Sequence, residues 1–236
     1  MSLTGKLTAL VGTKIAESVI PKDSVDDAVN SMLNKLGKAI GQKTAAEHIQ
    51  EIKKNYLVIK SKSYSISTIV SFFAGKTPNM NDYLGRYQIV DGNGILKYKT
   101  NAEDTITDRE ILDLFDASGK KVGYVKEHLI STGVPLLEKK VKKCTVFLRK
   151  EKIALLKKYV SFGDLEFDVL EGDVKITHEE GKNFKIHYKG KLVATLHDCP
   201  RNFMDGYVDK FVIEYENPAD EVVVILLATA IDLINT

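Results

Sequence analysis

The residues of this sequence best suited to chemistry are lysines in its middle third. Between residues 120 and 158, twelve Lys and Arg stand against three Glu, a local excess of about nine positive charges. The densest part consists of Lys139, Lys140, Lys142, Lys143, Arg149, Lys150, Lys152, Lys157 and Lys158. Ammonium and guanidinium groups at this density can bind a phosphate or another anion. On a strand, Lys140 and Lys142 would share one face, and Lys139 and Lys143 the other, so the group cannot all converge on one ligand.

The same lysines also suit a solvated outer surface. Residues 161–180 contain seven acids and one Lys, and acids on neighbouring strands would pair with the lysines. Four lysines on one face give about 4 kcal/mol toward an anionic bilayer, which corresponds to a Kd of about 1 mM. A headgroup pocket or an inserted helix would have to add the rest. An anion-binding surface and a solvated exterior both stay open.

No other group of residues forms a catalytic or metal-binding pattern. His197, Asp198 and Cys199 are a compact cluster of metal-ligand types, but adjacent residues point in different directions. Cys144 has no His near it in the sequence to act as a base. The acids of residues 164–173 lack the glycine and glutamate positions of a calcium loop, and glycine-loop, Gly-x-Ser-x-Gly and His-Glu-x-x-His motifs are absent. We therefore expect no enzyme, no metal and no cofactor.

Composition narrows the class of protein. The chain has 236 residues, of which 44% are hydrophobic and 28% charged, and this suits one large domain with an extension. A net charge of +2 argues against a general nucleic-acid binder. Two cysteines cannot build a disulfide framework, and no leader-like segment opens the chain. We expect a cytoplasmic protein, with transient attachment to a membrane face as an alternative.

Residues 1–55 are expected to form a separate helical extension. Apolar residues recur at helical spacing, and Thr44 with Glu47 forms an S/T-x-x-E box that predicts a helix start. The first expected helix has only Lys6 and Lys14 as cations, which is a poor match for a membrane surface. Packing against the rest of the chain or against a second copy is the expected role, so an oligomer through these helices is an alternative.

Residues 56–236 instead have the two-residue period of strands. Asp91–Gly94, Ala117–Lys120 and Lys189–Gly190 are turns between short alternating runs. A similar turn separates expected strands at 165–170 and 174–178. Short, regularly spaced strands predict an antiparallel sandwich or barrel.

The carboxyl-terminal segment breaks this period and predicts a helix. Asn217 suits an N-cap, Pro218 the first helical position and Glu221 the first turn, although the β-branched run alone favours a strand. The apolar positions include Val222, Val223, Val224, Ile225, Leu226, Leu227 and Ile231. Ten to twelve apolar residues span about 15–18 Å, too short for a hydrocarbon layer of about 30 Å. We therefore expect a mainly β fold, a closed barrel with this helix buried inside it.

Three stretches resemble the LURP-one-related family, which has the tubby C-terminal fold. They are Arg86–Lys97 (RYQIVDGNGILK), Leu114–Lys126 (LFDASGKKVGYVK) and Phe211–Asp232 (FVIEYENPADEVVVILLATAID). The resemblance covers about residues 56–236 and implies a barrel of about twelve strands around a hydrophobic C-terminal helix. Proteins of related fold include tubby proteins, which bind phosphoinositide headgroups, and phospholipid scramblases. No local motif aligns with tubby's lipid-binding residues, and the chain lacks the proline-rich region and cysteine cluster of scramblases.

The resemblance and the lysines together lead to one expectation about function. We expect a non-catalytic binding or scaffolding module that recognises an anionic lipid headgroup or a protein partner. The alternative is a lipid-handling protein of the scramblase type. Neither a nucleic-acid partner nor a transmembrane span is expected.

Overall fold

The computed structural model describes residues 43–52, 55–63, 87–103, 111–132, 139–158, 167–179, 183–199 and 206–235. Of the helical extension expected at residues 1–55, only α3 (Ala45–Glu51) falls within these ranges. The prediction for residues 1–42 lies outside the described residues.

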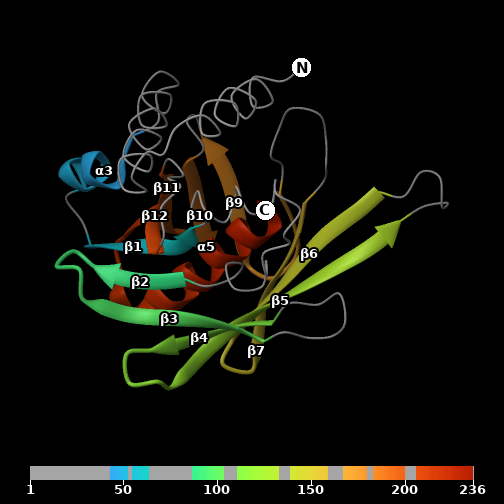
Figure 1. Ribbon diagram of the computed structural model, residues 1–236. Helices are drawn as coiled ribbons and strands as arrows, with labels where there is room; N and C mark the ends of the chain where they lie inside the picture. Colours follow the sequence, from blue (N-terminus) through green and yellow to red (C-terminus); the bar gives the residue numbers. More distant parts are fainter. Residues whose placement is uncertain are drawn as a thin grey trace, which may run out of the picture.

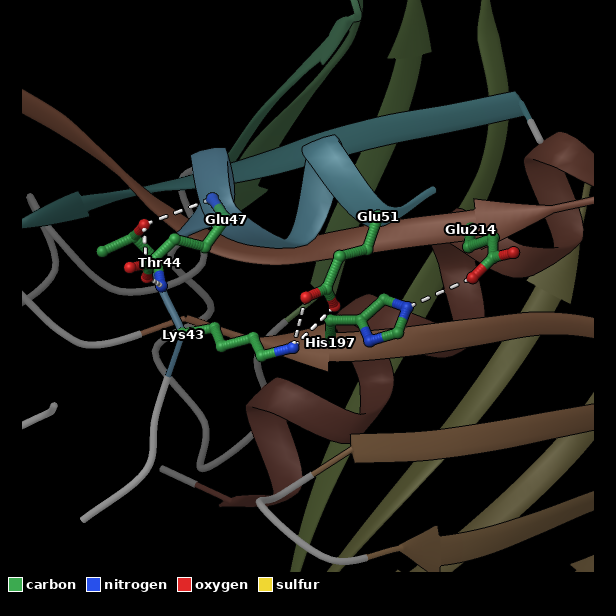
Figure 2. A network of polar contacts seen from close by, with 6 residues as sticks. All are labelled: Lys43, Thr44, Glu47, Glu51, His197 and Glu214. Carbon is green, nitrogen blue, oxygen red and sulfur yellow. Dashed lines mark hydrogen bonds and ion pairs between the residues drawn. The ribbon is translucent and has the colours of Figure 1, made fainter. Parts of the chain in front are cut away.

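Helix α3 begins at the capping box that the sequence predicts. The Thr44 hydroxyl accepts a hydrogen bond from the Glu47 backbone N–H, and the Glu47 carboxylate accepts one from the Thr44 backbone N–H at 2.8 Å. Figure 2 shows this reciprocal pair at the start of the helix. Because two backbone donors that a helix start leaves unpaired are satisfied, a helix of seven residues has a defined beginning.

The strands form one antiparallel sheet. They are β1 (Asn55–Ser63), β2 (Tyr87–Asp91), β3 (Leu96–Glu103), β4 (Ile111–Asp116), β5 (Lys121–Thr132), β6 (Lys139–Leu148), β7 (Glu151–Lys158), β8 (Phe167–Glu171), β9 (Val174–Glu179), β10 (Asn183–Tyr188), β11 (Lys191–Asp198) and β12 (Gly206–Tyr215). The twelve strands lie in the order β8-β7-β6-β5-β4-β3-β2-β1-β12-β11-β10-β9. The first strand therefore pairs with the last, and this pairing joins the two halves of the sheet (Figure 1).

The sheet is a nearly closed barrel whose seam lies between β8 and β9. The strands expected at 165–170 and 174–178 are present as β8 and β9 with a turn between them, but they are the opposite edges of the sheet order and do not pair as a hairpin. Gly172 in the turn has φ +100°, and a Cβ built there would lie 2.1 Å from the backbone oxygen of Ile153 on β7. The turn therefore packs against β7, next to the pairing of Glu171 with Leu155.

Helix α5 (Glu221–Asn235) is buried inside the curve of the sheet, as the sequence predicts (Figure 1). It follows a short 3-10 turn, η3 (Pro218–Asp220), where the Asn217 side chain accepts from the Ala219 N–H. Every residue from Val223 to Ile234 is buried, and the apolar side chains among them share one core with inward residues of the strands such as Ile89, Val146 and Leu196. The N-cap and burial outweigh the β-branched run's preference for a strand. Within the described ranges, no helix has the length and apolarity to cross a bilayer.

The two ends of the barrel differ in their connections. At one end, the turn end, strands are joined by short turns at residues 92–95, 117–120, 149–150, 172–173 and 189–190. At the other, the loop end, the connections are residues 64–86, 104–110, 133–138, 159–166, 180–182 and 199–205. The last turn of α5 lies at the loop end, because the Tyr87 hydroxyl at the start of β2 reaches Asp232. Binding residues often occupy the end of a scaffold that carries its longer connections.

Candidate functional site

Four of the predicted lysines meet on strands β6 and β7 at the loop end. Lys143 is the Cα partner of Lys157, and Lys142 and Lys158 occupy the next position along each strand. We call these four residues the lysine quartet. A bulge beside Val146 sets this register, because the backbone partners change there from Phe147–Lys152 to Val146–Ala154.

The quartet divides between the two faces of the sheet. Cys144 and Leu156 are the next pair along β6 and β7, and both are fully buried in the barrel core. Side chains alternate along a strand, so Lys142 and Lys158 lie on this inner face and Lys143 and Lys157 on the outer face. We refer to them as the inner pair and the outer pair.

One member of the inner pair has a carboxylate partner. Lys142 Nζ lies 3.3 Å from Glu127 Oε1 on β5, and the Glu127 side chain is 16% exposed. Burial lowers the pKa of Lys158, and the neighbouring Lys142 charge lowers it further. Lys142 is therefore ion-paired, and its charge lies close enough to Lys158 to disfavour a second charge there.

The outer pair lies in a row of charged and titratable residues that crosses four strands. His128 on β5 is the partner of Lys143, and Asp168 on β8 is the partner of Lys157. The central lysines are directly opposite each other, an arrangement in which like charges destabilise a sheet. An anion placed over Lys143 and Lys157 would offset that repulsion and accept hydrogen bonds from both ammonium groups.

The remaining predicted cations fall in two other places. Lys139 and Lys140 begin β6, where the backbone pairs with Thr132 and Ser131 of β5. The long β5–β6 hairpin extends beyond its neighbouring strands at this point (Figure 1). Arg149 and Lys150 form the β6–β7 turn at the opposite end of the barrel, and Lys152 nearby forms an ion pair with Glu171. The predicted set is therefore no single patch, and its loop-end part contains the quartet, Lys139 and Lys140.

A buried polar cluster at the loop end escaped the sequence analysis. Lys210 Nζ on β12 lies 3.1 Å from Asp232 Oδ1 of α5 and 3.8 Å from Asp198 Oδ1 of β11. The Tyr87 hydroxyl donates to Asp232 Oδ2 at 2.7 Å. Lys210 and Asp232 each interrupt an apolar run, and that interruption is the signal that could have revealed the pair. Their burial and mutual pairing indicate a structural link between helix and barrel.

The compact His197-Asp198-Cys199 cluster does not converge on a metal. His197 Nε2 lies 3.3 Å from Glu214 Oε2, whereas Asp198 faces Lys210. Burial, with the nearby Asp209 and Asp198 charges, raises the pKa of the Cys199 thiol to about 12, so it is a poor nucleophile. Among the described residues, no three His, Cys, Asp or Glu side chains form a group suited to a metal ion.

Comparisons with known proteins agree with the fold. No curated protein and no solved structure matches the chain. A sequence model of the LURP-one-related family matches residues 76–232, which include strands β2 to β12 and all but the last turn of α5. The match covers about two thirds of the chain and leaves α3 outside. Together with the twelve-strand sheet around a buried C-terminal helix, it shows that the chain belongs to the LURP-one-related family.

Proposed function

We propose that this protein is a non-catalytic binding module that recognises an anionic lipid headgroup through the outer pair of its lysine quartet, Lys143 and Lys157. The observation that supports this most is the register of the outer pair, which holds Lys143 directly opposite Lys157. Two like charges in this position do not stabilise the sheet. A phosphate group bound over them would accept hydrogen bonds from two adjacent ammonium groups.

The expected affinity is modest. Two lysines near an anionic leaflet contribute about 2 kcal/mol. Two charge-assisted hydrogen bonds to a phosphate add about 3–6 kcal/mol as an upper estimate. The sum of about 5–8 kcal/mol corresponds to a Kd between about 0.2 mM and about 1 μM. This range suits transient attachment to a membrane, with the barrel as a rigid support for the strands that carry the lysines.

Vesicle flotation tests the proposal. The double variant Lys143→Ala/Lys157→Ala should bind vesicles of phosphatidylcholine with a phosphorylated phosphoinositide about tenfold or more weakly than the unaltered chain. The matched control is Lys150→Ala/Lys152→Ala, which removes the same charge at the turn end and should change binding less than about twofold.

Two results would contradict the headgroup assignment. Equal loss in both double variants would indicate attraction by overall charge only, and unchanged binding in both would remove the outer pair from the site. Movement of a labelled lipid between the leaflets of the same vesicles would favour scramblase-type activity instead. Vesicle-independent capture of one protein that needs the outer pair would favour the protein-partner alternative.

A further inference from the structure

Helix α3 covers an apolar strip on the outside of the barrel. Ala45, with Ile49 and Ile52 beside it, packs against residues from three strands and from the end of β11: Val58, Val90, Val212 and Cys199. These side chains form a cluster separate from the barrel core. Because α3 comes before the twelve strands and is no member of the sheet, it is an addition to the outside of the barrel.

Two imidazole rings lie in contact where α3 meets the sheet. The rings of His48 on α3 and His197 on β11 are 4.7 Å apart between centroids and inclined by 31°. His48 is only 8% exposed. Burial lowers the pKa of His48, and the adjacent His197 lowers it further. A charge on His48 would therefore be poorly hydrated and close to a second titratable ring.

The charged groups around His48 offer it little compensation. On β12, Glu214 is already the partner of His197, at 3.3 Å from Nε2 (Figure 2). Just before α3, Lys43 Nζ lies 2.6 Å from the carboxylate of Glu51, which ends the helix. The Glu47 carboxylate accepts a hydrogen bond from the backbone N–H of Thr44, the N-cap residue. The Lys43 charge also lowers the pKa of His48, whereas the Glu51 charge and, least of all, the hydrogen bond with the Asp198 backbone raise it. The nearby carboxylates thus each have a partner within the described part of the chain.

We propose that α3 is a proton-sensitive strap, held to the barrel while His48 is neutral and released when His48 takes up a proton. Release would expose the apolar strip of β1, β2 and β12 together with Cys199. Since docking lowers the pKa of His48, docking strength is fully present above about pH 6.5, the ordinary His range, and is lost as the pH falls through the lowered value. The strap needs no ligand at the lysine quartet, so it stands apart from the proposed function.

The two cysteines provide a built-in measurement. Cys199 lies in the cluster under α3, whereas Cys144 lies in the barrel core. In a Cys144→Ala chain, a disulfide reagent that reacts at acid pH should label Cys199 about threefold or more faster at about pH 5.5 than at about pH 7.5, after normalisation to the unfolded chain. In a Cys199→Ala chain, labelling of Cys144 should stay flat, because the core remains closed. Parallel acceleration of both thiols would mean global opening and would overturn the strap.

Replacing the titrating ring separates the strap from other acid effects. His48→Phe keeps an aromatic ring against His197 but cannot take up a proton, so the acid-induced labelling of Cys199 should disappear. His178→Phe, which alters an exposed ring next to Phe184, should leave it unchanged. Persistent acid labelling in His48→Phe would overturn the proposal. Hydrogen exchange at the His48 and Ile52 amides of the unaltered chain, both bonded within α3, must show the same acid-dependent opening without any substitution.

Discussion

At the scale of single residues, the polar cluster at the loop end shows that a buried charge requires charged or hydrogen-bonding partners. Asp232 sits near the carboxyl end of α5, where the helix dipole disfavours a negative charge. Its two oxygens face the Lys210 ammonium at 3.1 Å and the Tyr87 hydroxyl at 2.7 Å. Lys210 in turn lies close to Asp198, at 3.8 Å. Each member of the cluster thus offsets the desolvation of another.

Removing the Asp232 charge should therefore destabilise the fold through the lysine that it leaves behind. We expect Asp232→Asn to lower the free energy of unfolding by about 2–3 kcal/mol, less than for an isolated buried pair because Asp198 stays near Lys210. Urea unfolding followed by circular dichroism measures the change. The double variant Lys210→Met/Asp232→Asn should recover part of the loss. If the double variant is as unstable as the sum of the two single variants, the pair is not coupled.

At the scale of elements, each end of α5 has its own attachment. At the turn end, Glu221 Oε2 accepts a hydrogen bond from the Tyr215 hydroxyl at 2.5 Å, and burial together with this carboxylate raises the pKa of Tyr215 and of Tyr98. At the loop end, Asp232 accepts a hydrogen bond from the Tyr87 hydroxyl and forms an ion pair with Lys210. Between the two attachments the helix approaches β5 closely. A Cβ at Gly123 would lie 2.6 Å from Leu226 Cδ1 and 2.6 Å from the Phe147 backbone oxygen.

Gly123→Ala should test this close approach. The Leu226 side chain can rotate, but the Phe147 oxygen belongs to the β6 backbone, so we expect a loss of about 1–3 kcal/mol in unfolding free energy. Gly92→Ala is the matched control, because its Cβ would meet the hydroxyl end of the Tyr56 side chain, at 2.6 Å. That half-buried ring end can move, and the control should lose less than about 1 kcal/mol. Equal stability of both variants would show that α5 has room to shift away from β5.

At the scale of the whole molecule, local signals in the sequence predicted more than long-range ones. The Thr44 capping box, the Asn217 cap and the Asp91 turn, where the carboxylate accepts from the Asn93 and Ile95 amides, are each determined by neighbouring residues. The burial of α5 followed from its composition. These features are confirmed because capping, turn chemistry and apolar content act within a few residues.

Register and distant pairing were beyond the same reasoning. Without the bulge beside Val146, Lys157 would lie opposite Lys142 instead of Lys143, and the quartet would divide differently between the faces. The seam between β8 and β9 follows from the pairing of β1 with β12, which are far apart in the sequence. The contact between His48 and His197 likewise joins residues that are distant in the sequence. The residues of the candidate site could thus be predicted from the sequence, whereas their arrangement in space could be learned only from the structure.

The closure of the sheet around α5 makes the core a test of the whole architecture. Val224 is 1% exposed and surrounded by apolar side chains of the barrel. A carboxylate there would lose its hydration without gaining a partner, so we expect Val224→Asp to destabilise the fold by more than about 4–5 kcal/mol and to prevent cooperative folding. Ile95→Asp, at a position that is 59% exposed, should melt like the unaltered chain. A soluble Val224→Asp protein with an unchanged thermal transition would mean that α5 is accessible to water, and the buried-helix barrel would then have to be abandoned.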